Sequence, residues 1–199
     1  MRNTVVRLTS LTLKNIKNVK NGTIIMPRAD EKKFEGCKAE ILGIYGQNGS
    51  GKTAIVDALY FLQNIMTGEK LEQSILDYID TDEVDAEVNA EFKIFEDSIL
   101  YEVGYHILVS KADNVSVIER EYLNCAINKD GYRTNKNIFM DYQRTQSEVV
   151  FTPLKRLAEL VGKDKNAKMD LIVARKMAER GNYSYIFGKE SREIFFKQR

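Results

Sequence analysis

Residues 46–53 read Gly-Gln-Asn-Gly-Ser-Gly-Lys-Thr, which matches the Walker A pattern G-x-x-x-x-G-K-[ST]. This motif constrains the fold because it needs a buried strand before it and a helix after it. An apolar run over residues 39–45 predicts the strand, with Ile41–Tyr45 in the interior of a sheet. The helix is predicted by a 3.6-residue spacing that ends at Gly68, with apolar residues at Ile55, Ala58, Leu59, Leu62, Ile65 and Met66.

Each residue type in this motif has a physical role in holding phosphate. Glycines accept positive φ and let the backbone approach an anion, and the N–H groups of residues 48–53 would point inward as a nest. Lys52 would reach the β- and γ-phosphates of ATP, and the Thr53 hydroxyl would ligate Mg²⁺. The sequence therefore predicts ATP and Mg²⁺ as cofactors, Thr53 as the metal ligand, and a nucleotide site of Gly46, Gln47, Asn48, Gly49, Ser50, Gly51, Lys52 and Thr53.

The composition is that of an ordinary globular protein. The chain has 199 residues, 43% of them hydrophobic, with 30 basic and 29 acidic side chains. No apolar stretch is long enough to cross a bilayer, and two cysteines, Cys37 and Cys125, cannot form a disulfide framework. We expect one domain with an appendage, in the cytoplasm and away from membranes, with both thiols free.

The charges are unevenly distributed along the chain. Residues 72–102 contain eleven carboxylates and only one base, Lys93, whereas residues 150–199 contain twelve bases and six acids. The basic segment is interleaved with acids and is typical of a solvated helical face. A contact between this segment and DNA phosphates is the alternative interpretation.

The remaining patterns divide the chain at about residue 152. Val5–Leu13 and residues 22–27 read as strands, and residues 69–79 as a second helical stretch. Val84–Phe95 alternates as a strand, and Ser98–Val109 and Val115–Ile127 read as two more strands of an antiparallel meander. Helical spacing follows from Pro153. We predict a nucleotide-binding lobe over residues 1–152 and a helical segment over residues 153–199.

Beyond the generic motif, the chain resembles the N-terminal part of ABC-type ATPase heads of the SMC/RecF-like group. The resemblance rests on Leu11–Asn18, Gly22–Ile24, Ile44–Thr53 and Asp57–Leu59, with Ile16 in place of the usual phenylalanine. It implies an α/β P-loop NTPase lobe with a mixed sheet, an added antiparallel meander and C-terminal helices. It also implies a homodimer that sandwiches nucleotide.

The resemblance assigns further residues to the site. A basic residue in the opening turn of the family lies near the γ-phosphate, which by position implies Lys17 rather than Lys14. A family glutamine after the β-rich segment ligates Mg²⁺ and senses the γ-phosphate, which implies Gln143 or Gln146.

Two parts of the ABC-type machinery have no match in the sequence. Hydrolysis in these enzymes uses a hydrophobic strand ending in Asp-Glu and a leu-ser-x-gly signature. The nearest candidate for the strand, Ile138–Asp141, lacks the glutamate, and His106 is interpreted as structural. The sequence therefore names no catalytic residue, and we expect a lobe of a longer ATPase that binds ATP but hardly hydrolyses it.

Two other functions are consistent with the motif. One is a complete small P-loop kinase or nucleotidyl transferase with Asp141 as the metal-supporting acid, which would require parallel β–α units over residues 84–127. The other is a non-catalytic module that uses nucleotide only as a switch.

Overall fold

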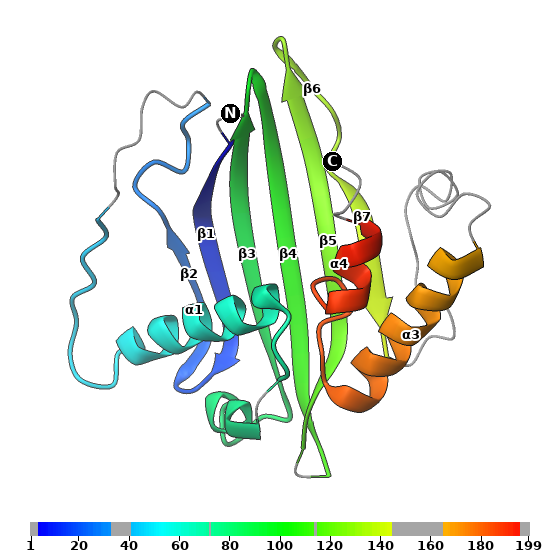
Figure 1. Cartoon of the computed structure of the whole chain (residues 1–199). Helices are drawn as coiled ribbons and strands as arrows, with labels where there is room; N and C mark the ends of the chain where they lie inside the picture. The colour runs from blue at the N-terminus through cyan, green and yellow to red at the C-terminus, as the bar shows by residue number, and fades with distance from the viewer. Residues whose placement is uncertain (1–3, 33–40, 72, 114, 145–164, 196–199) are drawn as a thin grey trace.

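A computed structural model describes residues 4–32, 41–71, 73–113, 115–144 and 165–195. Within them, one curled antiparallel sheet carries its helices on a single face (Figure 1). The sheet has the order β2-β1-β3-β4-β5-β6, and β7 also pairs with β5. The strands are β1 Thr4–Ile16, β2 Val19–Ile25, β3 Asp85–Glu96, β4 Ile99–Ala112, β5 Val115–Lys129, β6 Tyr132–Arg133 and β7 Asn137–Gln143.

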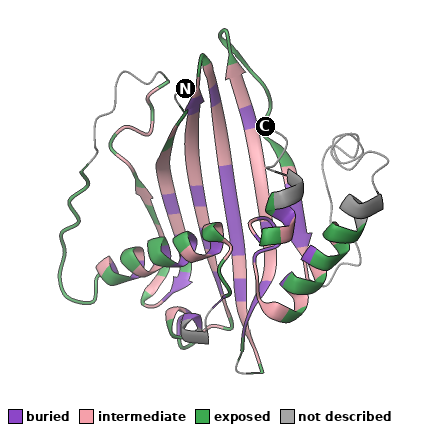
Figure 2. Cartoon of the chain, viewed as in Figure 1, coloured by how far each residue is buried: buried purple, intermediate pink, exposed green. Residues whose placement is uncertain are grey.

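The alternating pattern of the strands separates an apolar face from a polar one. The register pairs Leu13 with Val88 and Val88 with Ile107, and all three are buried in one core together with apolar side chains of the helices. Figure 2 shows buried segments along the central strands of the sheet. Because successive side chains point to opposite faces, the neighbouring row lies on the other side of the sheet. That row is polar and runs through Thr12, Asn89, His106, Tyr122 and Asp141.

Helix α1, Lys52–Thr67, crosses the apolar face of the sheet (Figure 1). It ends where the sequence predicts, because Gly68 adopts φ 80° and its N–H bonds the last carbonyls of the helix. Its buried side chains are Ala54, Ala58, Phe61, Leu62 and Ile65. Its opposite face leaves Val56 63% and Tyr60 51% exposed.

The other helical segments are shorter or lie near the C-terminus. The predicted helix over residues 69–79 is a 3₁₀ turn, η1, spanning Gln73–Tyr78. Helices α3, Lys165–Gly181, and α4, Lys189–Phe195, lie in the described part of the C-terminal segment. The predicted helix from Pro153 to residue 161 lies outside the described residues. No helix in the described ranges is long and apolar enough to cross a membrane.

The prediction of an interior strand at Ile41–Tyr45 is wrong for the described structure. The segment has no regular secondary structure, and Ile41 and Tyr45 are 90% and 94% exposed. A strand needs a neighbour for its N–H and C=O groups, and none of the seven described strands pairs with this segment. Because this segment forms no strand, every pairing between the described strands is antiparallel. The predicted mixed sheet is therefore also wrong for the described residues.

The three strands β3, β4 and β5 confirm the antiparallel meander. Each pairs with the next in the antiparallel sense, with Phe92 opposite Val103 and Val103 opposite Cys125. The β–α units that a small kinase requires over residues 84–127 are therefore not formed.

Candidate phosphate-binding site

Residues 46–51 form a loop that is exposed up to Ser50, buried at Gly51, and enters α1 at Lys52. Two of its glycines have left-handed backbones, Gly49 with φ 83° and Gly51 with φ 90°. A Cβ on Gly49 would meet nothing within 4 Å, whereas a Cβ on Gly51 would lie 2.6 Å from Cγ2 of Val19. At position 49, glycine is therefore favoured by the left-handed backbone alone. At position 51, glycine is favoured both by the left-handed backbone and by the close approach of Val19 in β2.

The side chain of Lys52 folds back into this loop. Its Nζ donates hydrogen bonds to the carbonyl oxygens of Gly46 at 2.7 Å and Gln47 at 2.6 Å, and lies 3.4 Å from Oγ of Ser50. The loop thus wraps around an ammonium group that stays accessible at the surface. An incoming anion could replace these neutral carbonyl partners with charge-assisted hydrogen bonds, which are about twice as strong.

The electrostatics at this end of α1 favour an anion. The first turn of the helix carries no acidic side chain, so the positive end of the helix dipole is not neutralised there. Residues 46–50 and Thr53 are exposed, and within the loop the N–H of Ser50 donates to the carbonyl oxygen of Gln47 at 3.2 Å. This arrangement suits a phosphate group with an associated hard cation.

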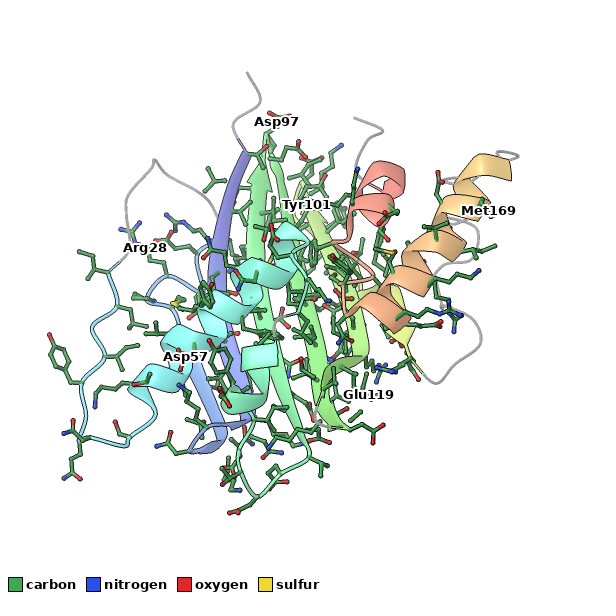
Figure 3. The ribbon with its side chains drawn as sticks, turned by 60° about the horizontal axis from the view of Figure 1, so that its bottom comes forward. Arg28, Asp57, Asp97, Tyr101, Glu119 and Met169 are labelled. Carbon is green, nitrogen blue, oxygen red and sulfur yellow. The ribbon has the colours of Figure 1, made fainter. Side chains whose placement is uncertain are left out.

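The turn between β1 and β2 packs against the loop. Asn18 donates a side-chain hydrogen bond to the carbonyl oxygen of Gly49. Lys17, with φ 51°, forms an ion pair with Asp57 in α1, which Figure 3 labels. The backbone N–H of Lys17 donates to the carbonyl oxygen of Tyr78 at 2.6 Å, which anchors the turn to the end of η1.

The structure therefore brings Lys17 to the loop but not Gln143. In the sheet register, Lys14 faces Glu87, and the same row continues through Leu108 and Arg120 to Gln143. Four strand spacings separate the two ends of this row, about 19 Å along the sheet. Gln146 lies outside the described residues.

Asp141 and His106 both lie in the polar face and have structural partners. Asp141 forms a bidentate ion pair with Arg120 at 3.0 and 2.8 Å, and the amide of Gln143 lies 3.4 Å from it. His106 stacks on Tyr122 with ring centroids 4.5 Å apart, and burial lowers the pKa of its imidazole. These contacts agree with a structural role for His106 and occupy the carboxylate that a kinase would use.

The two cysteines contribute no metal site in the described residues. Cys125 is a half-buried thiol on β5 that forms no disulfide with a described residue, and Cys37 lies outside the described residues. Within the described ranges, no three His, Cys, Asp or Glu side chains gather closely enough to hold a metal ion. Any Mg²⁺ here would therefore need oxygens of the bound ligand in addition to Thr53.

Three contacts at the site were not predicted: those of Asn18, Val19 and Asp57. Asn18 and Asp57 belong to the segments that carry the SMC/RecF-like resemblance, which was a signal that they share a site. Nothing in the local sequence indicates which loop residue they meet, because Asn18 is 31 residues from Gly49, its hydrogen-bond partner.

Comparison with known proteins agrees with the resemblance read from the sequence. The DNA replication and repair protein RecF of Deinococcus radiodurans is 33% identical over 99 residues, which cover 50% of this chain and 24% of that protein. A solved structure of the recombination mediator protein RecF with ATP aligns with 88% of this chain and 44% of its own. Its sequence identity is 14% and its TM-score 0.30, too low to transfer geometry.

The chain thus spans about a quarter of the curated relative and less than half of the solved one. The AAA domain family matches residues 10–173, which include the phosphate-binding loop, the described sheet except the first six residues of β1, and the first half of α3. The chain therefore belongs to the AAA domain family and is related to RecF, as the SMC/RecF-like resemblance of its N-terminal segments implies.

Proposed function

We propose that residues 46–53 bind the phosphates of ATP with Mg²⁺, and that the chain is the nucleotide-binding part of a RecF-like ATPase. The observation that carries this proposal is the position of the Lys52 ammonium group. It lies inside a glycine loop, at the start of a helix, with only neutral partners at 2.6 to 3.4 Å. A cation held in this way is ready to exchange carbonyl oxygens for phosphate oxygens.

In this proposal each group of the loop has one task. The loop N–H groups and the N-terminus of α1 hold the phosphates, and Lys52 neutralises charge on the β- and γ-phosphates. The exposed hydroxyl of Thr53 supplies one oxygen to Mg²⁺, which when bound would neutralise and orient the phosphate oxygens. Lys17 is a second cation on the side of the β1–β2 turn and would approach the γ-phosphate by leaving Asp57.

We further propose that the groups needed for rapid hydrolysis lie outside residues 1–199. Asp57, in the second turn of α1, is engaged in an ion pair with Lys17. Exposed apolar side chains lie on the segment before the loop, at Ile41 and Tyr45, and on the outer face of α1, at Val56 and Tyr60, and a further layer of protein would bury them. A second lobe or a second subunit, in a nucleotide-bound homodimer, could supply both the layer and the missing groups.

Calorimetric titration of the 199-residue chain with ATP and Mg²⁺ tests the site. Wild type should bind, and Lys52→Ala should lose at least about tenfold in affinity, since a charge-assisted contact contributes about 1.5–3 kcal/mol. Lys129→Ala, which removes an exposed lysine at the end of β5, is the matched control and should bind like wild type. Equal ATP affinity in wild type and Lys52→Ala would disprove the assignment of the loop.

The name of the curated relative extends the proposal to DNA. The relative is named as a DNA replication and repair protein, and α3 includes the basic residues Arg175, Lys176 and Arg180. Fluorescence anisotropy with a labelled duplex would test a contact with DNA. Binding that weakens steeply with added salt would support it, and no binding at low salt would contradict it.

A further inference from the structure

Glu121 on β5 is a carboxylate buried in the core, with 0% exposure. Its Oε1 accepts hydrogen bonds from the hydroxyls of Tyr105, at 2.6 Å, and Ser184. Its Oε2 accepts from the backbone N–H groups of Tyr185 at 2.8 Å and Ile186 at 3.4 Å. No lysine or arginine in the described part of the chain forms an ion pair with it, so four hydrogen bonds compensate the buried charge.

Three of these four donors belong to one short segment. Residues 182–188 connect α3 to α4 without joining the sheet as a strand, so the N–H groups of Tyr185 and Ile186 find their acceptor in Glu121. The hydroxyl of Ser184 also accepts a hydrogen bond from the N–H of Phe187, at 2.8 Å. Glu121 therefore fixes the path of this connection over the sheet.

The same segment contacts the C-terminal end of α1. The N–H of Leu71 donates to the carbonyl oxygen of Asn182 at 2.7 Å, and Lys70 forms a β-bridge with Tyr183. At the helix stop, a Cβ on Gly68 would lie 2.6 Å from the carbonyl oxygen of Phe187. The connection thus meets the end of α1 and the residues after it through backbone contacts, and the guanidinium of Arg192 also lies against Gly68.

We propose that Glu121 is a positioning residue for the nucleotide site, acting through the connection 182–188 on the end of α1 opposite to Lys52. Helix α1 is a rigid body of about 24 Å, so a displacement of its C-terminal end also moves the phosphate-binding loop. This inference rests on the proposed ATP site and adds a determinant of that site on β5. Because binding couplings are reciprocal, bound ATP should in turn stabilise the connection.

Two substitutions at Glu121 separate the hydrogen-bonding role from simple space filling. Glu121→Leu keeps about the same volume but removes every acceptor. Glu121→Gln can turn its carbonyl oxygen to the two backbone N–H groups and donate its NH₂ to the hydroxyls of Tyr105 and Ser184, which accept as well as donate. Gln should therefore rescue the function that Leu loses. If Glu121→Leu does not fold, Ser184→Ala removes one donor as a milder change.

Hydrogen exchange without nucleotide gives the first readout. The amides of Tyr185 and Ile186 should exchange at least about tenfold faster in Glu121→Leu than in wild type, and at nearly the wild-type rate in Glu121→Gln. Unchanged exchange in a folded Glu121→Leu protein would overturn the role of Glu121 in holding the connection.

ATP affinity gives the second readout. Glu121→Leu, or Ser184→Ala in its place, should weaken ATP binding about three- to tenfold, Gln should restore it, and ATP should slow exchange over residues 182–188 in wild type. Faster exchange with unchanged ATP affinity would overturn the positioning role and leave the ATP site intact. Failure of wild type to bind ATP would instead overturn the proposed function, and this is seen before any Glu121 variant is made.

Discussion

The ammonium group of Lys17, in the turn between β1 and β2, forms an ion pair with the carboxylate of Asp57 in the second turn of α1. The pair is partly buried, and Nζ of Lys17 also lies 5.3 Å from the ring centroid of Tyr78. It joins the hairpin to the helix that carries the phosphate-binding loop. The cation in this ion pair, Lys17, is the one that the family resemblance assigns to the γ-phosphate.

If Lys17 contacts the γ-phosphate, removing it should affect ATP more than ADP. We expect Lys17→Met to weaken ATP binding about three- to tenfold and to leave ADP binding unchanged, within the range of one charged contact. Asp57→Asn should bind ATP as well as wild type or better, because the lysine is released. Equal weakening of ATP and ADP by Lys17→Met, measured by calorimetry, would indicate that the pair only supports the loop.

The two left-handed glycines of the loop should differ in their tolerance of alanine. Gly49→Ala adds only backbone strain, about 1–2 kcal/mol, because nothing lies within 4 Å of its Cβ position. Gly51→Ala adds the same strain and a collision with Val19, so urea unfolding should show a larger loss. Combining Gly51→Ala with Val19→Ala should relieve the collision. A Gly51→Ala loss no larger than that of Gly49→Ala would contradict the close approach of β2.

Much of this fold could be predicted because its signals are local. The alternation from Val84 to Phe95 requires only neighbouring residues to specify a strand with one apolar face, and β3 occupies Asp85–Glu96. The stop at Gly68 is likewise a property of one residue and the turn before it. The segment Ile41–Tyr45 was predicted wrongly because a buried strand is a property of its neighbours, and no described strand lies beside it.

The contacts that complete the site could not be read from local patterns. Asn18, Val19 and Lys17 meet the loop and α1 only after the hairpin folds over them. The burial of Glu121 could not be predicted for a different reason. The pairing of β4 with β5 shifts register just before it, so the alternation of β5 is broken at Glu119 and does not mark Glu121 as facing the core.

The exposed apolar segment before the loop should tolerate polar substitution. Tyr45 is 94% exposed, so Tyr45→Ser should change the unfolding free energy by less than about 0.5 kcal/mol and reduce self-association. Ile107→Ala, in the buried row of β4, is the contrasting variant and should lose about 2–5 kcal/mol. A loss above about 1 kcal/mol for Tyr45→Ser would show that the segment packs within the isolated chain.

The free energy of unfolding should depend on pH because of the buried carboxyl group of Glu121. Burial raises the pKa of this carboxyl above its ordinary value, although its four hydrogen bonds oppose the shift. Burial also raises the pKa of the nearby Tyr105 and Tyr185 hydroxyls. Both hydroxyls therefore stay neutral over the pH range in which a carboxyl group titrates.

Between the unfolded and folded pKa values of Glu121, the native state binds more protons than the unfolded state. The contribution of Glu121 to the free energy of unfolding therefore falls as the pH rises from about 4.3, by at most about 1.4 kcal/mol per pH unit. Glu121→Gln lacks this titration. Its unfolding free energy relative to wild type should rise with pH over that window and then level off. A difference that is flat from pH 4 to 8, in urea titrations of both proteins, would contradict a raised pKa.

The last prediction concerns turnover. Rapid transfer of a phosphoryl group to water requires a base within hydrogen-bond reach of the water and stabilisation of the γ-phosphate from both sides. The proposed site offers Lys52, Thr53 and Lys17 on one side, and Asp57 is held by Lys17. We therefore expect the 199-residue chain to bind ATP with Mg²⁺ and to release phosphate at close to the uncatalysed rate. Activity should appear when a second lobe and a dimer partner are supplied.

A phosphate-release assay decides whether the 199-residue chain hydrolyses ATP, with Lys52→Ala as the blank. Several turnovers per minute in wild type, lost in Lys52→Ala, would show that these residues form a complete enzyme. Tight binding without turnover under every condition, the second lobe included, would instead favour a nucleotide switch.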